Sequence, residues 1–572
     1  MDGATLVAKC VAQQGIDVVF GVVGIPVVEV AVAFQSVGVH FVGMRNEQAA
    51  SYAASAMGYL TGSPGVCLVV SGPGVIHAMA GMVNAQENCW PLLVIGGSSD
   101  QNQEGRGAFQ EYPQVDICRS CTKYSARPST VSNIPFVIEK AVRTCLSGRP
   151  GVCYVDLPGD MITAQTETAD LSIPSRYPGP PRPLAEPERI QEAVRLMRRA
   201  KCPLVVIGKG AASARAEHPI QTLMHLTGFP FLPSPMGKGV IADDHQQCVA
   251  AARSTALSQS DVILLLGARL NWMLHFGLPP RFRADVKLIQ VDIHGEELGN
   301  NVQAAVGLQG DLQSVSKQLC NEWVKSGEDN RVKTEYLDLW WTKLKTKSEA
   351  NRQKSKELSD LTTIPMNYYQ VFGKIKQYVD RNTYIISEGA NTMDIGRTML
   401  ENSLPRHRLD AGTFGTMGVG IGFAIAAAMY VREGGEKANG RRVVCIEGDS
   451  AFGFSGMEYE TACRYNLPIV FIIVNNNGIY SGLKPSVWNE SIQPNPTLRA
   501  PPTALLPDAR YDKLASVFGG HGYFVTTPSE LSTTLQQVFS HPTSQPVIIN
   551  VIIDPTSDRK TQEFFWLTKS SL

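Results

Sequence analysis

The chain has 572 residues, which is too long for a single hydrophobic core and predicts three or four domains at ~150 residues each. Apolar residues make up 44% and charged residues 18%, values typical of a folded protein with large buried sheets. Lys plus Arg equals Asp plus Glu at 52 each, so neither a nucleic-acid-binding surface nor a charged tail is indicated.

Targeting and redox signals are weak. No stretch reaches the ~20 apolar residues that span a bilayer, and the first twenty residues lack a basic region followed by an apolar one. We therefore expect a soluble, intracellular protein. Twelve cysteines without regular spacing agree with a reducing compartment. Cys118 and Cys121 form one C-x-x-C pair, which is either a redox or metal site or, since no second pair accompanies it, two incidental thiols.

Short apolar runs alternate with stretches long enough for helices along most of the chain. Nearly continuous apolar character over four to six residues is typical of strands in parallel sheets that are covered on both faces. The pattern predicts βαβ units and doubly wound sheets, an α/β fold. The predicted buried strands are Val66–Val70, Leu92–Ile95, Leu204–Ile207, Val262–Leu266, Leu288–Val291, Val443–Ile446 and Ile469–Val474.

Two changes of composition divide the chain into three blocks. Pro174–Pro187 is too rich in proline for a helix or strand and is predicted to be a semi-rigid linker. The charge-dense segment Lys325–Asp360 is predicted to be a second, partly helical connection. The expected domains are residues 1–165, 186–320 and 365–572, with residues 321–364 as a linker.

The first and third blocks contain related passages. In each, a buried strand closes on a glycine and the next strand opens after a proline, with spacings of 19 (Gly72 to Pro91) and 20 (Gly448 to Pro468). A match over one βαβ unit can arise by chance in α/β proteins. It is also what two homologous halves that share one ligand would show.

The third block holds the clearest chemical motif. Asp449 follows one predicted strand and Asn476 follows the next, 27 residues later. If the strands are adjacent and parallel, both side chains lie at the edge of the sheet where such folds bind ligands. With the Gly478 carbonyl they offer the hard oxygen ligands that suit Mg²⁺, and Gly448 with the following helix N-terminus can receive a diphosphate. The alternative is a strand-end Asp and a turn-forming Asn run without a ligand.

Gly448-Asp449-Ser450 and the Asn475–Asn477 run resemble the G-D-G…N-N signature of thiamine-diphosphate enzymes, with Ser450 in place of the last glycine. The resemblance implies three doubly wound domains: pyrimidine-binding, middle and diphosphate-binding. It also implies a catalytic glutamate that shares a proton with the aminopyrimidine ring of the cofactor. Glu47 matches that position; otherwise it is a first-turn glutamate favoured by the helix dipole.

Further cofactor contacts follow from the same resemblance. It implies that the Gly415 carbonyl accepts from the cofactor amine and that Met417 holds the cofactor bent, although Met417 could be an ordinary core residue. The remaining implied contacts are Asn391, Thr392, Gly448, Ser450 (through its NH or hydroxyl), Ala451, Ile479 and Tyr480. Because Glu47 and the metal motif belong to different subunits in most of these enzymes, we expect a homodimer or a homotetramer.

The stretches RNEQAA, GAFQE, GARLNW, LDAGTFGTMG and EGDSAFGFSGME narrow the resemblance to the 2-hydroxyacyl-CoA lyases over nearly the whole chain. This implies cleavage of a long-chain or 3-methyl-branched 2-hydroxyacyl-CoA to formyl-CoA and an aldehyde one carbon shorter, as in fatty acid alpha-oxidation. Gln110 lies where a related glutamine contacts the reacting group, so we expect it to orient the substrate.

Residues that would recognise the CoA group are harder to identify in the sequence than those that would bind the cofactor. Lys209 in a Gly-rich turn, Arg269 and Asp292 at a strand end fit a nucleotide pocket in the middle block, where related oxalyl-CoA decarboxylases bind ADP. Further candidate phosphate contacts are Arg406, Arg408 and Arg559.

Alternatives remain open on function and location. They are an oxalyl-CoA decarboxylase, an acetolactate-synthase-like enzyme carrying FAD, and a regulatory scaffold that binds the cofactor without turnover. The chain ends in Ser570-Ser571-Leu572, a degenerate form of the S-K-L peroxisomal address. The family implies import through the peroxisomal receptor, with the cytosol as the alternative.

Overall fold

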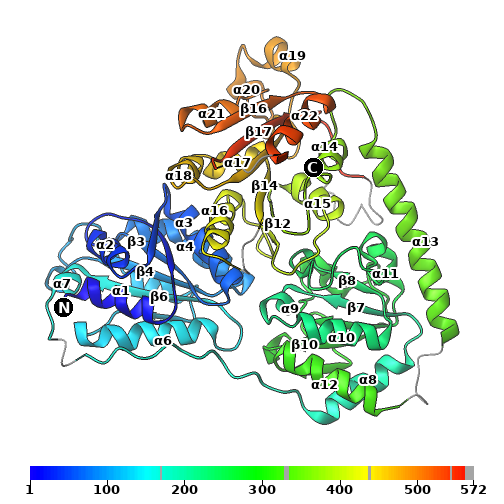
Figure 1. Ribbon diagram of the computed structural model, residues 1–572, viewed down its shortest axis with the longest axis horizontal. Coiled ribbons are helices and arrows are strands. Elements are labelled where there is room, and N and C mark those ends of the chain that lie inside the picture. Colours follow the sequence, from blue (N-terminus) through cyan, green and yellow to red (C-terminus); the bar gives the residue numbers. More distant parts are fainter. Residues whose placement is uncertain (168–170, 328–333, 436–439, 541–543, 561–572) are drawn as a thin grey trace.

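The computed structural model describes residues 1–167, 171–327, 334–435, 440–540 and 544–560, which form three α/β domains (Figure 1). Each domain is built on one sheet of parallel strands, as the apolar runs predicted. All seven predicted buried strands are strands of these sheets. In Figure 1 the N-terminal domain lies at the left, the central domain at the lower right and the C-terminal domain at the top.

The N-terminal sheet has six parallel strands in the order β2-β1-β3-β4-β6-β5. Its strands are β1 (Val18–Val22), β2 (His40–Gly43), β3 (Gly65–Val69), β4 (Leu92–Ser98), β5 (Tyr124–Ala126) and β6 (Val152–Pro158). Its helices are α1 (Gly3–Gln13), α2 (Val28–Ser36), α3 (Glu47–Thr61), α4 (Pro73–Asn88), α5 (Gln114–Arg119), α6 (Ile134–Leu146) and α7 (Gly159–Thr163).

The central sheet has five parallel strands in the order β11-β10-β9-β7-β8. Its strands are β7 (Pro203–Ile207), β8 (Phe231–Pro233), β9 (Val262–Leu266), β10 (Lys287–Asp292) and β11 (Val306–Gln309). Its helices are α8 (Pro187–Arg199), α9 (Lys209–Ser213), α10 (Glu217–Thr227), α11 (Arg253–Gln259) and α12 (Leu312–Lys325).

The C-terminal sheet has six parallel strands in the order β13-β12-β14-β15-β17-β16. Its strands are β12 (Thr383–Ser387), β13 (Arg408–Asp410), β14 (Arg442–Gly448), β15 (Ile469–Asn475), β16 (His521–Val525) and β17 (Val547–Ile552). Its helices are α14 (Tyr368–Ile375), α15 (Ala390–Met399), α16 (Gly420–Arg432), α17 (Asp449–Ser455), α18 (Glu458–Arg464), α19 (Pro485–Val487), α20 (Pro496–Arg499), α21 (Asp512–Val517) and α22 (Pro528–Ser540).

The two terminal sheets have the same strand order when their strands are numbered from one to six: 2-1-3-4-6-5. The two βαβ passages that match in sequence occupy the same place in both sheets, as β3-α4-β4 and as β14-α17-α18-β15. The internal similarity of the sequence therefore corresponds to two domains of one topology.

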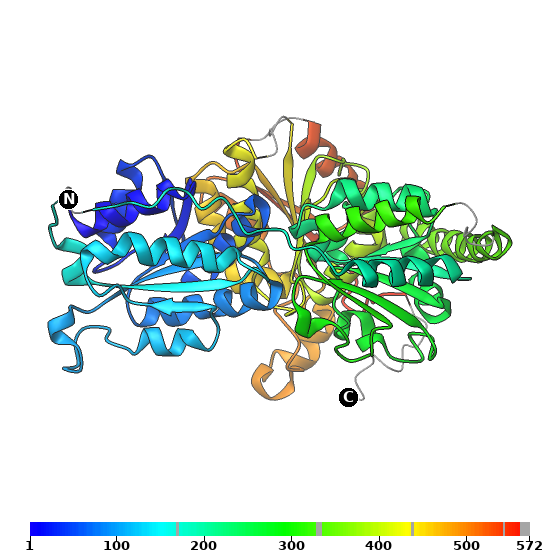
Figure 2. The ribbon, with the colours of Figure 1, turned by 90° about the horizontal axis from the view of Figure 1, so that it is seen from below.

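Both connecting segments behave as their composition predicted. Residues 171–186 contain no helix or strand and run between the first two domains (Figure 2). The second connection contains α13 (Thr334–Ser359), a long helix along the outer side of the central and C-terminal domains (Figure 1). None of the helices in the described ranges is long and apolar enough to cross a membrane.

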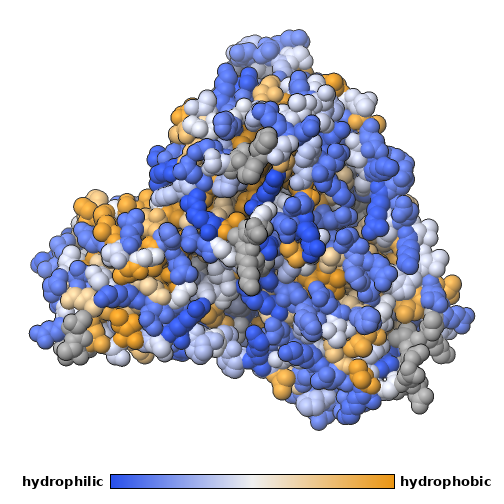
Figure 3. Space-filling model, in the orientation of Figure 1, coloured by the Kyte–Doolittle hydropathy of each residue, from blue (hydrophilic) through white to orange (hydrophobic). Residues whose placement is uncertain are grey.

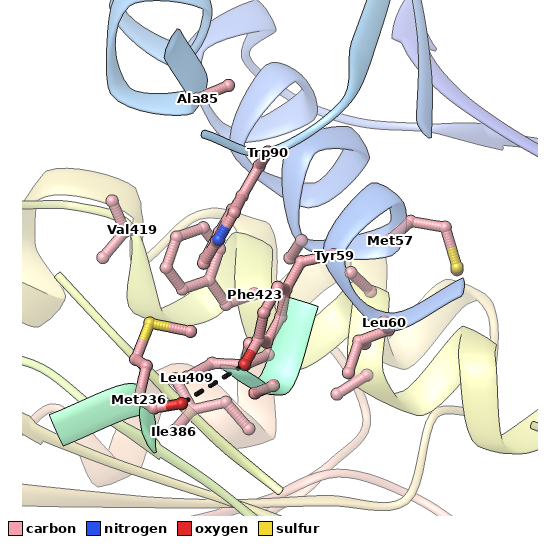
Figure 4. Packing of buried hydrophobic residues seen from close by; sticks show 14 of the residues in the cluster. Met57, Tyr59, Leu60, Ala85, Trp90, Met236, Ile386, Leu409, Val419 and Phe423 are labelled. Carbon is pink, nitrogen blue, oxygen red and sulfur yellow. Dashed lines mark hydrogen bonds between the residues drawn. The ribbon is translucent and has the colours of Figure 1, made fainter. Parts of the chain in front are cut away.

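The three domains share part of their core (Figure 4). Tyr59 of α3 stacks on Trp90 with ring centroids 5.0 Å apart, and Trp90 packs against Phe423 of α16 at 5.2 Å. The Tyr59 hydroxyl donates to the carbonyl of Met236 in the central domain. Because such aromatic contacts are buried, they fix the relative positions of the domains and of the loops between them.

Candidate active site

The carboxyl edge of the C-terminal sheet gathers most of the predicted site. β12, β14 and β15 are neighbours, and the register pairs Gly448 at the end of β14 with Val474 on β15. Asp449 and Asn476 therefore leave the sheet at the same edge. This adjacency is the condition on which the predicted metal site depended.

Asp449 is the first residue of α17 and is almost fully buried. Burial raises the pKa of Asp449 to about 7, although the backbone N–H groups of Ser450, Gly478 and Asn476 act in the opposite direction. These N–H groups bring the 476–478 segment close to the carboxylate. Among the described residues, no group hydrogen-bonds to Asp449 Oδ1. A buried carboxylate oxygen without a donor fits a bound cation.

Asn476 and Gly478 complete this oxygen set. The Asn476 amide nitrogen donates to the Tyr480 carbonyl at 2.9 Å, which fixes the amide group and leaves its oxygen as the group able to bind a cation. A Cβ at Gly478 would lie 2.4 Å from the Ser481 carbonyl oxygen, so no other residue fits this turn. A carboxylate, an amide oxygen and a backbone carbonyl are a donor set that suits Mg²⁺.

The predicted diphosphate contacts lie beside these oxygens. α15 begins after Gly389, whose Cβ would lie 3.2 Å from the Gly448 nitrogen, so the loops before α15 and α17 touch. Asn391 and Thr392 are buried in the first turn of α15, and no described group hydrogen-bonds to the Asn391 amide nitrogen. Free donors at a helix N-terminus fit a diphosphate.

The flanking residues predicted to contact the cofactor differ in exposure. In α17, Ser450 is half-buried and Ala451 is fully buried. After β15, Ile479 and Tyr480 are about half exposed, and the Tyr480 hydroxyl donates to Asp558 near the end of the described chain. The C-terminal segment therefore contacts the rim of this site.

Residues 412–418 form a loop held by contacts from the other domains. The Thr413 nitrogen donates to Asn88 Oδ1 at 3.0 Å, and the Thr416 hydroxyl donates to Asn84 Oδ1 at 2.9 Å, both on α4. Gly415 has a φ of 70° and open space above its Cα, and Met417 is half-buried. The loop thus places both predicted cofactor contacts between the two terminal domains.

A buried carboxylate, that of Glu388, holds the end of this loop in place. Glu388 accepts hydrogen bonds from the Gly418 and Gly420 nitrogens, and so caps the N-terminus of α16. Burial, and then the nearby Glu447, raise the pKa of Glu388 well above its usual value. The sequence indicated Asn391 and Thr392 nearby, but it did not reveal this contact of Glu388 with a loop thirty residues away.

Glu47 lies at the corresponding edge of the N-terminal sheet. It is the first residue of α3, after the N-cap Asn46, and its side chain is 12% exposed. Glu458 of α18 accepts from the Arg45 and Asn46 nitrogens and fixes this turn. Glu47 Oε2 lies 3.0 Å from His77 Nδ1 on α4, a neighbour that the sequence did not reveal.

Within one chain Glu47 is separated from the 412–418 loop. No hydrogen bond or ion pair within the described ranges joins its carboxylate to that loop or to the Asp449 segment. On α4, His77, which contacts Glu47, and Asn84, which holds Thr416, are seven residues apart, about 10 Å along a helix.

Gln110 lies in the exposed loop after β4. Its φ of 57° is in the left-handed region, which is unfavourable for a residue with a side chain and is often found at functional sites. Its side-chain oxygen accepts from the Ser71 hydroxyl at 3.1 Å, next to the start of α4.

The predicted nucleotide contacts occupy an interface rather than an open pocket. Lys209 donates to Asn88 Oδ1 and to the Thr413 hydroxyl, and Arg269 reaches the same hydroxyl. Burial lowers the pKa of Lys209 to about 7. Both line a cavity of about 50 Å³ between the central and C-terminal domains, which is too small for a nucleotide in this conformation. Asp292 pairs with Arg149 at 3.1 Å.

Two of the predicted phosphate contacts have a different environment from the expected one. Arg406 pairs with Glu217 of the central domain and donates to the Ala212 carbonyl, and Arg408 is fully buried beside Asp410. Neither presents a guanidinium group to a CoA phosphate, so the structure does not support these two assignments. Arg559 remains partly exposed and pairs with Asp394 at 2.9 Å.

The structure adds a basic cluster that the sequence analysis missed. Arg253 and Arg281 of the central domain lie near Arg397 of α15, which shares Asp394 with Arg559. Burial, then Arg397 and Arg281, lower the pKa of Arg253 to about 10. Burial, then Arg253 and Arg281, lower the pKa of His275 to about 4. Clustered guanidinium groups are side chains suited to a phosphate ligand.

The C-x-x-C pair has no features of a redox or metal site. Burial raises the pKa of both the Cys118 and the Cys121 thiol, so the reactive thiolate is disfavoured. Among the residues that the structure describes, no group of three or more His, Cys, Asp or Glu side chains could hold a metal ion. The interpretation of incidental thiols is favoured.

Comparisons with known proteins agree with this geometry. The models of the thiamine pyrophosphate enzyme N-terminal, central and C-terminal domains match residues 1–117, 190–319 and 388–551. The chain is 54% identical to 2-hydroxyacyl-CoA lyase 1 of Mus musculus over all of this chain and 97% of that protein. Identity to the Homo sapiens protein of the same name is also 54%, over all of this chain and 98% of that one.

A more distant relative is the oxalyl-CoA decarboxylase of Escherichia coli (strain K12), at 38% identity over 97% of this chain and 95% of that protein. The similarity to the lyases therefore extends over the full length and is the stronger of the two. The chain belongs to the thiamine pyrophosphate enzyme family, within its 2-hydroxyacyl-CoA lyase branch.

Proposed function

We propose that this chain is a thiamine-diphosphate- and Mg²⁺-dependent carbon–carbon lyase that cleaves 2-hydroxyacyl-CoA to formyl-CoA and an aldehyde one carbon shorter. The observation that carries the proposal is that Asp449 and Asn476 follow adjacent parallel strands at one sheet edge, in a chain that is 54% identical over its full length to relatives named 2-hydroxyacyl-CoA lyase 1.

The residues of this chain have distinct tasks in holding the cofactor. Asp449, Asn476 and Gly478 bind the metal, and Asn391, Thr392 and Ser450 receive the diphosphate. Gly415 and Met417 support the pyrimidine side, and Glu47 shares a proton with the ring. When bound, the cofactor supplies an electron sink that makes breakage of a bond next to a carbonyl feasible.

The overall reaction balances without an oxidant or reductant. The C1–C2 bond of the substrate breaks, and the 2-hydroxyl proton leaves as the C2–O group becomes the aldehyde carbonyl. The thioester carbon gains a hydrogen and is released as formyl-CoA. Gln110, held in a strained conformation beside Ser71, orients the hydroxyl or the thioester carbonyl.

The CoA phosphates bind to the basic cluster between the central and C-terminal domains. Arg253, Arg281 and Arg397 gather there beside Asp394 and Asp410, and Arg559 is partly exposed at the edge of the cluster. The cluster lies at the same domain interface as Lys209 and Arg269, which an opening of that interface would make available to the nucleotide portion.

The active unit is a homodimer or a larger homo-oligomer, in which Glu47 of one subunit completes the metal-binding half of the other. Two features support this. Among the described residues, no hydrogen bond or ion pair joins the Glu47 carboxylate to the 412–418 loop of its own chain. Exposed apolar side chains, which a partner would cover, rim both half-sites: Ile25, Ile76, Phe109, Phe414, Phe454 and Met457. Figure 3 shows further hydrophobic patches over the N-terminal domain.

The test of the activity is an assay of products with two substrates. Purified protein with thiamine diphosphate and Mg²⁺ is given 2-hydroxyhexadecanoyl-CoA or oxalyl-CoA, and products are read by mass spectrometry. We expect formyl-CoA and pentadecanal from the first. Carbon dioxide from oxalyl-CoA without aldehyde from the hydroxyacyl substrate would instead establish the decarboxylase function that the Escherichia coli relative is named for.

We also propose a peroxisomal location and a role in fatty acid alpha-oxidation, which supplies 2-hydroxyacyl-CoA. The support is the resemblance to the family and the terminal Ser570-Ser571-Leu572, which lies outside the described residues. A fluorescent reporter carrying the last ten residues tests the signal. Punctate fluorescence that overlaps a peroxisomal marker is expected, and diffuse cytosolic fluorescence would contradict a working terminal address.

A further inference from the structure

His77 contacts Glu47, the predicted catalytic acid, and has no role assigned to it so far. Its Nδ1 lies 3.0 Å from Glu47 Oε2, the imidazole side chain is 57% exposed, and the Glu47 carboxylate is 12% exposed. Glu47 is the first residue of α3 and His77 the fifth residue of α4, and they are 30 positions apart in the chain. This pair is the one polar side-chain contact made by Glu47 within the described ranges.

The contact depends on a close approach of the two helices. A Cβ at Gly81, one turn after His77, would lie 2.0 Å from the Ser51 hydroxyl oxygen, so only glycine allows α3 and α4 to touch there. That contact aligns their first turns and directs the imidazole at the carboxylate. The hydrogen bond between His77 and Glu47 is therefore fixed by the packing of the two helices.

The two oxygens of Glu47 have different surroundings. Oε2 faces His77, whereas Oε1 lies above Gly74, where an added Cβ would stand 3.4 Å from it. Gly74 thus places no side chain of its own beside Oε1, and the nearest side chain to that position is the apolar Val70. A carboxylate with one oxygen held and one left open has a defined direction for a second hydrogen bond.

We propose that His77 is a positioning residue for Glu47, and this rests on the proposed function. The Nδ1–H group donates to Oε2 and leaves Oε1 for the ring nitrogen of the cofactor. A hydrogen bond to a charged acceptor is stronger than one between neutral groups, and it also restrains the rotation of the carboxylate. His77 therefore fixes the orientation of the acid toward the ring nitrogen.

The test measures exchange of the cofactor C2 hydrogen for deuterium by NMR, without substrate, in the intact oligomer with Mg²⁺. His77→Leu removes the donor at similar volume and should slow exchange about tenfold, the effect of losing one partly exposed hydrogen bond to a charged group. His77→Asn places an amide N–H close to the position of Nδ1 and should stay within about threefold of the wild type. His225→Leu, an exposed histidine of α10, is the matched control and should not change the rate.

A second readout separates positioning from loss of structure. The calorimetric affinity for thiamine diphosphate should change less than about threefold in each variant, because the diphosphate and metal are held by the other terminal domain. Wild-type exchange in His77→Leu would overturn the inference, and so would equal slowing in the Leu and Asn variants. A wild-type protein that binds no cofactor or shows no exchange would overturn the proposed function, and the inference with it.

Discussion

The N-terminal and C-terminal sheets share one strand order but have different chemistry at their carboxyl edges. Where β14 ends, Gly448 is followed by Asp449, and where β3 ends, the matching Gly72 is followed by Pro73. At the C-terminal edge, buried polar groups such as Asp449 and Asn391 have atoms without a hydrogen-bond partner among the described residues, whereas at the N-terminal edge the Glu47 carboxylate lies near exposed apolar side chains such as Ile76.

This difference shows how one scaffold can supply two halves of a single site. One edge binds by electrostatics, because its oxygens and N–H groups suit a cation and a diphosphate. The other edge provides an acid, Glu47, which is held in place by His77. The proposed activity needs both halves, and a substitution can disable either half separately. We expect one substitution to impair catalysis and the other to impair binding of the cofactor.

The largest effect is expected from Glu47→Gln, which removes the acid from the N-terminal half. Turnover should fall about 10²–10⁴-fold, the usual contribution of a general acid–base group. Cofactor affinity should change little, because the amide keeps the volume and one hydrogen bond. Steady-state kinetics and calorimetry check this, and a variant with more than half of the wild-type turnover would contradict the assignment.

Asp449→Ala should damage the C-terminal half at the level of binding. We expect the affinity for thiamine diphosphate to fall at least about a hundredfold, because the diphosphate is held through the metal. EDTA should imitate the variant, with recovery on adding Mg²⁺ and cofactor. Titration calorimetry of the apo-protein measures the loss, and Asp285→Ala, an exposed carboxylate of the central domain, is the control.

A mixture of the two inactive variants tests whether the Glu47 half and the metal-binding half of the site come from different subunits. Random reassembly of Glu47→Gln with Asp449→Ala chains gives mixed dimers with one intact site each, so about a quarter of wild-type activity should return. If both halves came from the same chain, no mixed dimer would contain an intact site. Activity that stays at the level of the parent variants after denaturation and refolding together would therefore place the site within one subunit.

The smallest effect concerns the strained residue on the N-terminal edge. Gln110→Gly removes the side chain from a backbone with a φ of 57° and should change the free energy of unfolding by less than about 1 kcal/mol. Turnover should nevertheless fall about tenfold if the amide orients the substrate. Thermal unfolding and kcat are measured together, and an unchanged kcat would remove Gln110 from the site.

The features predicted from sequence were those determined by local patterns. Runs such as Ile469–Val474 are apolar because both faces of their sheet are covered, and all seven predicted strands are present. The Asp449 and Asn476 motif was visible because strand ends of adjacent parallel strands meet at one edge. The family resemblance supplied the rest of the fold class.

Features that depend on distant contacts could not be predicted in this way. Arg406 and Arg408 looked like phosphate contacts, because their sequence neighbours do not include the partners that bury them, Glu217 and the Arg397–Asp410 pair. The Arg253 cluster combines residues scattered over three hundred positions, so no spacing indicates it. The His77–Glu47 contact arises from two helices packing at a glycine, a geometry that composition does not encode.

The packing of α3 also has a consequence for how the chain is made. Nearly all of α3 is buried, and one of its faces lies against α16, which begins about 360 residues later. At ordinary rates of synthesis this leaves the face uncovered for tens of seconds after α3 leaves the ribosome. Three side chains along it (Ala49, Ala53 and Ala56) bury little apolar area each, while Tyr52 packs against Phe423 of α16 with ring centroids 6.4 Å apart. Until α16 is synthesised, Tyr52 is therefore the main apolar side chain that this face of the N-terminal domain leaves exposed.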